Sequence, residues 1–174
     1  MHAAFVLTVI GRDRPGLVER LASLIAAHGG NWLESRMGRL GGEFAGILRF
    51  SLPADHEAEL RHDLEALETS GLTVLVRRDT EAAPTPGRVA IIELVGHDRP
   101  GIVQQIAAIV AARGANVEEL ESECVSAPMS GEPLFKATLR IALPSFLELP
   151  ALRAELERVS ADLLVDAVIR PVTP

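Results

Sequence analysis

The string Asp-Arg-Pro-Gly occurs twice in this chain of 174 residues, beginning at Asp13 and at Asp98. In both places it separates an apolar run from a segment of helical periodicity, so we expect it at the start of a helix. The free N–H groups of a first helical turn carry a partial positive charge and attract a carboxylate. The aspartate could pair with an ammonium group, and Asn31 or Asn116, just past the far end of the helix, offers a donor and an acceptor. These residue types predict a pocket for a free α-amino acid.

The two strings are part of a longer internal repeat. Residues 11–34 align without a gap with residues 96–119 and are identical at 12 of the 24 positions, and residues 44–53 match residues 135–144. The offset grows from 85 to 91 between these stretches, so the second copy carries six additional residues, placed near Met129. The candidate ligand-binding residues lie in the repeated segments of both copies. In the first copy they are Gly11, Asp13, Arg14, Pro15, Gly16, Leu17, Val18 and Asn31, and in the second Gly96, His97, Asp98, Arg99, Pro100, Gly101, Ile102, Val103 and Asn116.

Hydrophobic periodicity predicts the elements that hold these loops. Short, nearly continuous apolar runs predict the first strands, and aliphatic residues at helical spacing follow them, ending at Gly29 and Gly114. Pro15 and Pro100 fit the first turn of these helices, where no N–H is needed. Gly41-Gly42 predicts a tight hairpin turn. The predicted strands lie at 4–10, 44–52 and 72–77 in the first copy and at 89–95, 134–143 and 164–169 in the second. One more strand is predicted to begin at each repeated asparagine. A second helix in each copy is indicated by Leu60, Leu64 and Leu67 and by Leu152, Leu156 and Val159.

The resulting order, βαββαβ, occurs twice. It predicts an α+β chain of two tandem ferredoxin-like units, each a four-stranded antiparallel sheet with two helices on one face. The expected domains are 1–79 and 89–174, joined at 80–88 by a short, stiff linker with two prolines and a glycine. A longer loop at 126–133 replaces the hairpin turn in the second unit. Units of about 80 residues lie near the lower limit of domain size, so we expect each to lean on the other.

Composition narrows the class of protein. The net charge is −7 without any basic run, which argues against direct nucleic-acid binding, and one Trp with five Phe is too few aromatic residues for an RNA-binding sheet. No apolar segment approaches the ~20 residues needed to span a bilayer, and no signal peptide is evident. The single cysteine excludes an intrachain disulfide. We therefore expect a soluble cytoplasmic protein without membrane contact.

Catalytic and metal-binding patterns are not visible in the sequence, and we expect no cofactor. The five histidines lack metal-ligand spacing and are expected on solvent-facing sides of helices. Cys124 is expected to be buried in a strand, and no nucleophile elbow or phosphate-binding loop occurs. One enzyme alternative remains: acylphosphatases share this topology and use an arginine and an asparagine near the positions of Arg14 and Asn31, or of Arg99 and Asn116.

The pattern of each copy consists of a strand, the string Asp-Arg-Pro-Gly followed by an aliphatic residue and a valine, an aliphatic helix, and Gly-x-Asn. This pattern resembles the ACT domain, a small regulatory module that binds amino acids. The resemblance covers both units and hence nearly the whole chain. It implies a ferredoxin-like fold, pairing of ACT units through their sheets or helices, pairing into a homodimer among them, and a ligand held between units. The ligand contacts of amino-acid-binding ACT domains carry over to these positions: Asp13, Gly16 and Asn31, and Asp98, Gly101 and Asn116.

Tandem ACT units without an attached enzyme resemble the glycine cleavage system transcriptional repressor family. This resemblance implies a non-enzymatic regulatory protein that senses a small amino acid, with glycine or serine favoured. It also implies that the protein reaches DNA only through a protein partner such as a transcription regulator. Some relatives place a histidine where this chain has Gly11 and Gly96, so the identity of the ligand stays open.

Simpler interpretations compete with ligand binding. An aspartate before a helix is an ordinary N-cap, proline is common at the first helical position, and Gly16 would then only permit close packing. A ligand-free ACT pairing module would retain the repeated string by common descent of its halves. The halves differ at Arg12 against His97 and at Trp32 against Val117, which predicts two unequal sites or reflects drift on exposed loops. Trp32 itself is expected to be a partly buried packing residue.

Overall fold

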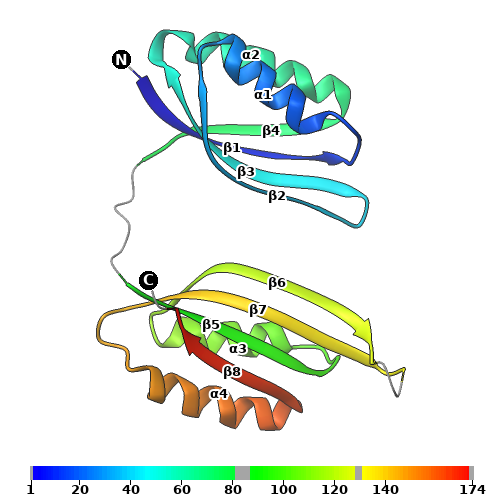
Figure 1. Ribbon diagram of the computed structural model, residues 1–174, viewed down its shortest axis with the longest axis vertical. Helices are drawn as coiled ribbons and strands as arrows, with labels where there is room; N and C mark the ends of the chain where they lie inside the picture. The colour runs from blue at the N-terminus through cyan, green and yellow to red at the C-terminus, as the bar shows by residue number, and fades with distance from the viewer. Residues whose placement is uncertain (1, 81–86, 128–130, 173–174) are drawn as a thin grey trace. The chain divides into compact units, whose positions relative to one another are not determined.

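The chain forms two compact units, Met1–Ala83 and Pro84–Pro174. Each is a four-stranded antiparallel sheet with two helices on one face (Figure 1), so the predicted pair of ferredoxin-like units is confirmed. Most of the linker expected at 80–88, and part of the insertion expected near Met129, lie outside the described residues. The computed structural model describes residues 2–80, 87–127 and 131–172.

The two units repeat one element order. The first strand lies in the sheet interior, and a hairpin and two crossover helices supply the rest of each unit. The strand orders are β2-β3-β1-β4 and β6-β7-β5-β8. The first unit contains β1 (His2–Arg12), α1 (Leu17–Ala27), β2 (Asn31–Leu40), β3 (Glu43–Pro53), a 3-10 turn (Ala54–His56), α2 (Glu57–Glu65), a second 3-10 turn (Ala66–Ser70) and β4 (Leu72–Arg78). The second contains β5 (Arg88–His97), α3 (Ile102–Ala112), β6 (Asn116–Ser126), β7 (Pro133–Leu143), α4 (Leu149–Leu163) and β8 (Val165–Pro171).

Each unit has its own apolar core between its sheet and its helices. Alternate residues of β1, namely Phe5, Leu7 and Val9, point to the helices and are completely buried, because successive side chains of a strand face opposite sides. Phe5 stacks on Phe50 across the β1–β3 pair, with ring centroids 5.5 Å apart. Phe50 and Phe135 lie in the cores of the first and the second unit, respectively. The buried apolar residues in the described ranges form two clusters, one in each unit.

Two side chains near the end of α1 test the sequence predictions. Trp32 is partly buried against the first core, as expected, and its Nε1 donates a hydrogen bond to Ser35 Oγ at 3.3 Å. The prediction that His28 faces solvent is wrong. Its side chain is only 14% exposed, and its Nε2 lies 2.8 Å from Asp63 Oδ2. His56 Nδ1 lies 2.7 Å from the carbonyl oxygen of His28. The packing of α2 and the turn before it over the end of α1 accounts for the difference.

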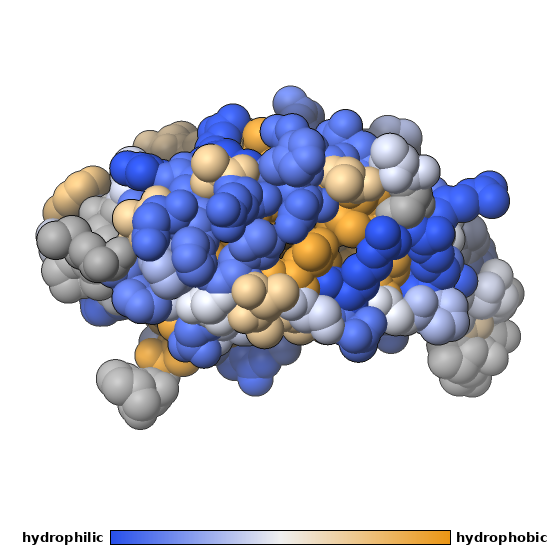
Figure 2. Space-filling model, turned by 90° about the horizontal axis from the view of Figure 1, so that it is seen from above, coloured by the Kyte–Doolittle hydropathy of each residue, from blue (hydrophilic) through white to orange (hydrophobic). Residues whose placement is uncertain are grey.

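The helix-covered side of the first unit is mostly hydrophilic, with apolar surface between the polar side chains (Figure 2). The helices α1 and α2 border a depression of about 520 Å³ there. None of the sequence-predicted ligand residues lines it. Its lining residues are Glu19, Arg20, Ser23, Leu24, Ala27, Asp63, Ala66 and Leu67.

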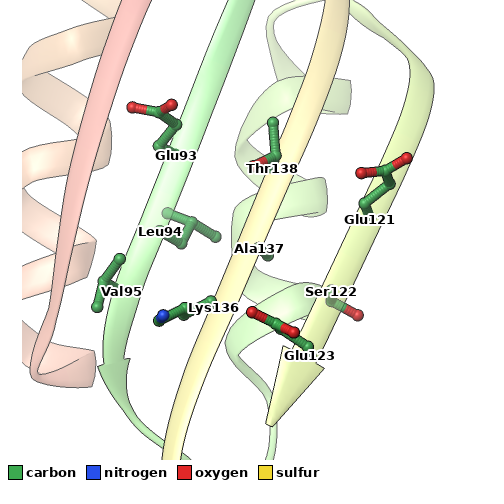
Figure 3. Close-up of a pocket in the computed structure, with 9 residues that line it drawn as sticks. All are labelled: Glu93, Leu94, Val95, Glu121, Ser122, Glu123, Lys136, Ala137 and Thr138. Atoms are coloured by element: carbon green, nitrogen blue, oxygen red, sulfur yellow. The ribbon is translucent and has the colours of Figure 1, made fainter. Parts of the chain in front are cut away.

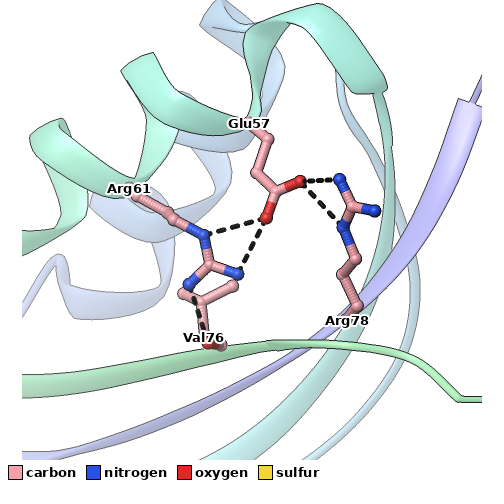
Figure 4. A network of polar contacts seen from close by, with 4 residues as sticks. All are labelled: Glu57, Arg61, Val76 and Arg78. Carbon is pink, nitrogen blue, oxygen red and sulfur yellow. Dashed lines mark hydrogen bonds and ion pairs between the residues drawn. The ribbon is translucent and has the colours of Figure 1, made fainter.

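A carboxylate between two arginines connects α2 to β4 (Figure 4). Glu57 Oε1 accepts hydrogen bonds from Arg61 Nε at 3.0 Å and Nη2 at 2.9 Å, and Glu57 Oε2 accepts from Arg78 Nε at 2.9 Å. Arg61 Nη1 also donates to the carbonyl oxygen of Val76 at 2.8 Å. The Glu57 side chain is only 18% exposed. The hydrogen bond from Arg78, followed by that from Arg61, holds the pKa of this carboxyl below its ordinary value.

Glu57→Gln is expected to lower the free energy of unfolding of the first unit by about 1 kcal/mol at pH 7. Because the folded-state pKa is depressed, the stabilisation is present above the unfolded-state pKa and is lost as pH falls through the folded-state value. The difference between the two proteins should therefore vanish in acid, which urea titrations from pH 7 down to about pH 3 would measure. Glu65→Gln, at an exposed site on the same helix, is the matched control and should change little.

Candidate ligand-binding site

The repeated loops place a glycine directly before each first helix. Gly16 and Gly101 are the N-cap residues of α1 and α3, with φ angles of 88° and 94° in the left-handed region that glycine favours. A Cβ at Gly16 would meet no atom within 4 Å, so this glycine serves the backbone conformation and not close packing. Pro15 and Pro100 precede the caps, so the prediction that they lie in the first helical turn is wrong.

The helix starts are open toward the loops. In the described structure no side-chain hydrogen bond caps either helix, so the interpretation of the two aspartates as N-caps is wrong. The first intrahelical bonds run from Arg20 N–H to Gly16 O at 2.9 Å and from Gln105 N–H to Gly101 O at 3.0 Å. The three N–H groups before each of these donors have no acceptor within the helix. Each helix therefore presents a partial positive charge to its loop.

Some residues at the start of each helix are buried, and others are exposed. Leu17 and Ile102 lie in the two cores and anchor the helices there, so their side chains are closed to a ligand. Val18 and Val103 are 46% and 36% exposed. The two arginines of the repeated string are exposed as well. Among the candidates at the helix start, the valines and arginines are thus the side chains that a ligand could contact.

Gly11 and Gly96 hold two strands close together. A Cβ at Gly11 would lie 2.5 Å from the carbonyl oxygen of Gly71, and one at Gly96 would lie 2.6 Å from that of Leu164. These carbonyls come directly before β4 and β8, which pair with β1 and β5. Gly96 and His97 also line a depression of about 490 Å³ at this end of the second sheet. The two glycines therefore have a packing role that is independent of any ligand.

The first aspartate is paired within its own unit. Asp13 N–H donates to the carbonyl oxygen of Gly42 at 3.0 Å, which ties the loop to the β2–β3 turn. Asp13 Oδ2 lies 2.8 Å from Arg39 Nε on β2, with the two side chains 34% and 68% exposed. Ion pairs at such exposed sites contribute about 1 kcal/mol or less to stability.

The second aspartate has a different neighbour. Asp98 N–H donates to the carbonyl oxygen of Pro133 at 3.2 Å, and its carboxylate lies near the thiol of Cys124. The pKa of this thiol is raised, first by the loss of solvent around the sulfur and then by the charge and hydrogen bond of Asp98. Cys124 is exposed, so the prediction of a buried cysteine is wrong. The reason is that β6 is an edge strand.

Asp98→Asn should accelerate alkylation of Cys124 by iodoacetamide at pH 8, since loss of the carboxylate charge lowers the pKa of the thiol and raises the fraction of thiolate. The rate is followed by mass spectrometry, and the single cysteine makes the signal unambiguous. Asp13→Asn, the same change in the other unit, is the control and should leave the rate unaltered. Equal rates in all three proteins would show that Asp98 does not contact the thiol in solution.

The repeated asparagines lie at the other end of the sheets from the loops. Asn31 pairs with Ser51, which pairs with Ala4 at the start of β1, whereas the loop follows Arg12 at the end of β1. Ala4 and Arg12 are eight residues apart, which corresponds to about 26 Å of strand. Asn116 occupies the equivalent place in the second sheet, opposite Ala142. Within one unit, therefore, a small ligand cannot touch both the aspartate and the asparagine.

Another polar depression lies on the helix-free face of the second sheet (Figure 3). It has a volume of about 430 Å³ and combines three carboxylates, Glu93, Glu121 and Glu123, with one ammonium group, that of Lys136. None of the predicted ligand residues lines it. The sequence signal that points to it is the alternation of polar residues along β6 and β7, which places these side chains on one face. The remaining lining residues are Leu94, Val95, Ser122, Ala137 and Thr138.

The corresponding face of the first sheet carries exposed apolar side chains. Ile10, Ile47 and Leu75 are each about half exposed on it. Ile47 and Leu75 both lie opposite Thr8, on the two strands that flank β1. The register of the second sheet puts Glu93 where the first has Thr8. The two units therefore share a fold but present different outer sheet faces.

In the ranges 2–80, 87–127 and 131–172, no three His, Cys, Asp or Glu side chains converge closely enough to hold a metal ion. Within the same described part of the chain, no helix is both long and apolar enough to cross a membrane.

Comparison with known proteins agrees with the internal repeat. The model of the ACT domain family matches residues 3–77 and 88–127, one segment in each half of the chain. The glycine cleavage system transcriptional repressor of Escherichia coli is 28% identical over 119 residues, which cover 67% of this chain and 63% of that protein. The match thus spans less than two thirds of the length of this curated relative.

Solved structures share the architecture over the full length. The crystal structure of an unknown protein from Galdieria sulphuraria has a TM-score of 0.86 and 34% identity, and the match covers 99% of this chain and 100% of that one. A second crystal structure, of a protein provisionally assigned as a glycine cleavage system transcriptional repressor, has a TM-score of 0.74 and 19% identity over 100% and 99% of the two chains, and shows the fold alone. Since the family model matches both units, this chain belongs to the ACT domain family and consists of two ACT units in tandem.

Proposed function

We propose that this protein is a non-enzymatic ACT regulator that binds a small amino acid and conveys its presence to a protein partner. The observation that carries the proposal is the loop found in both units. Each copy combines an open helix N-terminus, a glycine cap in the left-handed conformation and an exposed aspartate. A free α-amino acid has the complementary groups, because its carboxylate suits the helix N–H groups and its ammonium group suits the aspartate.

The asparagine of the predicted site comes from another ACT unit in this proposal. Asn31 lies about 26 Å along the sheet from the loop of its own unit, at ~3.3 Å per residue. A ligand that contacts both groups is therefore held between paired units, either of one chain or of a homodimer. The half-exposed Ile10, Ile47 and Leu75 support pairing, since apolar side chains gathered on one sheet face favour association.

Glycine and serine are the favoured ligands because of the relative in Escherichia coli, whose name connects it with the glycine cleavage system and with repression of transcription. A net charge of −7 favours a protein partner over direct contact with DNA. Ligand binding can transmit a signal only through a difference in affinity between two arrangements of the protein. In this proposal those arrangements are alternative pairings of ACT units, of which the partner binds one.

The same geometry bears on two alternative functions. A ligand-free ACT pairing module would need the apolar sheet face but not the open loops. An acylphosphatase-like enzyme would need an arginine and an asparagine around one phosphate. Arg14 and Asn31 lie at opposite ends of their unit, which argues against that arrangement.

A thermal-shift and calorimetry screen of the twenty amino acids tests the proposal. Glycine or L-serine at a hundredfold its Kd should stabilise the protein by ~2.7 kcal/mol, because a ligand that binds only the folded state shifts the unfolding equilibrium. Asp13→Ala and Asp98→Ala show which loop is responsible. Absence of any binder would favour the ligand-free module. Hydrolysis of acetyl phosphate that is lost in Arg14→Ala would instead support the enzyme.

A further inference from the structure

One exchange between the two units changes the chemistry of the repeated loop. Arg39 and Cys124 occupy the same place, since Arg39 pairs with Phe44 on β3 and Cys124 pairs with Phe135 on β7, and the two phenylalanines match in the repeat. Both side chains contact the aspartate of their own loop. In the first unit a guanidinium nitrogen lies 2.8 Å from the carboxylate, whereas in the second unit the neighbour of the carboxylate is a thiol.

The exchange leaves the second aspartate without a neutralising charge. Among the described residues, no guanidinium or ammonium group forms an ion pair with Asp98. Residues 128–130, which lie outside the described residues, are Pro, Met and Ser and carry no positive charge. The position of Arg12 in the first copy is taken by His97 in the second, and His97 Nδ1 lies 3.6 Å from Glu132 Oε2. Both exchanges reduce the positive charge around the second loop.

A ligand ammonium group therefore meets different surroundings at the two loops. At Asp13 it would have to displace the Arg39 guanidinium and remain close to it, and like charges near a protein surface repel strongly at such distances. At Asp98 it would meet a thiol in place of a guanidinium, and a carboxylate that forms no ion pair within the described residues. The backbone does not add to this difference, because the caps Gly16 and Gly101 have nearly the same conformation.

Resting on the proposed function, we infer that the two loops are unequal and that Asp98 is the carboxylate that binds the ligand ammonium group. Arg39 occupies the corresponding place on Asp13 and closes the first loop to an amino acid. The protein then takes one amino acid per chain at the loop of its second unit, and the first unit has a pairing role. The residue at this position, Arg39 on β2 or Cys124 on β6, decides whether the loop of its unit can bind an amino acid.

Four variants of the full chain test this inference by isothermal titration with glycine and with L-serine. Asp98→Asn should raise the Kd at least tenfold, whereas Asp13→Asn, which tests the first loop directly, should change it less than twofold if Arg39 closes that loop. Cys124→Arg should raise the Kd about tenfold, because it places a guanidinium beside the open carboxylate. Arg39→Cys should increase the stoichiometry from one to two amino acids per chain. All four positions are exposed, so thermal denaturation should show each variant to be folded.

The outcomes separate this inference from the function on which it rests. Equal losses of affinity in Asp13→Asn and Asp98→Asn, or two amino acids bound per unaltered chain, would overturn the inequality and leave amino-acid binding intact. If neither amino acid binds, the favoured ligands are wrong, and titration with methylammonium chloride tests the inequality alone. Backbone amide signals should then shift at Asp98 and not at Asp13. Shifts at both loops, or at neither, would overturn the inference.

Discussion

Gly96→Ala is expected to lower the free energy of unfolding of the second unit by about 3 kcal/mol, at the upper end of the cost of overpacking. An added Cβ would lie 2.5 Å from Val165 Cγ1, 2.6 Å from Leu164 O and 2.6 Å from Val165 Cα. Two of these three atoms belong to the backbone, so relief requires β8 to move away from β5. Because protein interiors are close-packed, that movement would disturb the core beneath both strands.

Scanning calorimetry measures the effect, which should be a fall of roughly 10–20 °C in the Tm of the second unit. Gly38→Ala is the control, since Gly38 also lies in a strand and a Cβ there would meet nothing within 4 Å. That change should be neutral or stabilise the first unit by up to about 1 kcal/mol through the unfolded state. Similar melting of the two variants would mean that β5 and β8 are less closely packed in solution than in the structure.

The order of elements could be predicted from the sequence because it depends on local patterns. Apolar runs and helical stripes fall within single segments, and the repeat showed that each half has one pattern. The start of the helix was harder to predict. A proline followed by a glycine is compatible with proline in the first turn and also with Pro15 ahead of a left-handed Gly16, and the residue types alone do not give the sign of φ. The boundaries at 79 and 89 remain predictions.

The contacts of the candidate site depend on residues distant in sequence, which explains what the motif alone could not predict. The ion pair of Asp13 with Arg39 joins the loop to the second strand, and no local pattern indicates it. The separation of Asp13 from Asn31 did have a signal. Counting back from the hairpin at Gly41-Gly42 places Asn31 opposite the end of β3, and therefore level with the start of β1. The exposure of Cys124 needed the knowledge that β6 is an edge strand.

Phe50→Ala should destabilise the first unit by about 3–5 kcal/mol, since a completely buried phenylalanine leaves a large cavity and loses its stacking on Phe5. Fluorescence of Trp32, the only tryptophan of the chain, follows unfolding of the first unit in urea. Amide hydrogen exchange of peptides from residues 88–171 follows the second unit. We expect the fluorescence midpoint to fall and exchange in the second unit to stay unchanged, because the described residues form two separate cores.

Ile141→Ala is the reciprocal variant, because Ile141 occupies the place of Phe50 in the second repeat and is also completely buried. It should lower the free energy of unfolding of the second unit by about 2–5 kcal/mol, which accelerates amide exchange there. The urea midpoint of the Trp32 fluorescence should stay unchanged. If both variants instead moved both signals together, the units would unfold as one. A ligand bound at one loop would then stabilise the whole chain, and the regulatory states would have to differ by more than the pairing of two independent units.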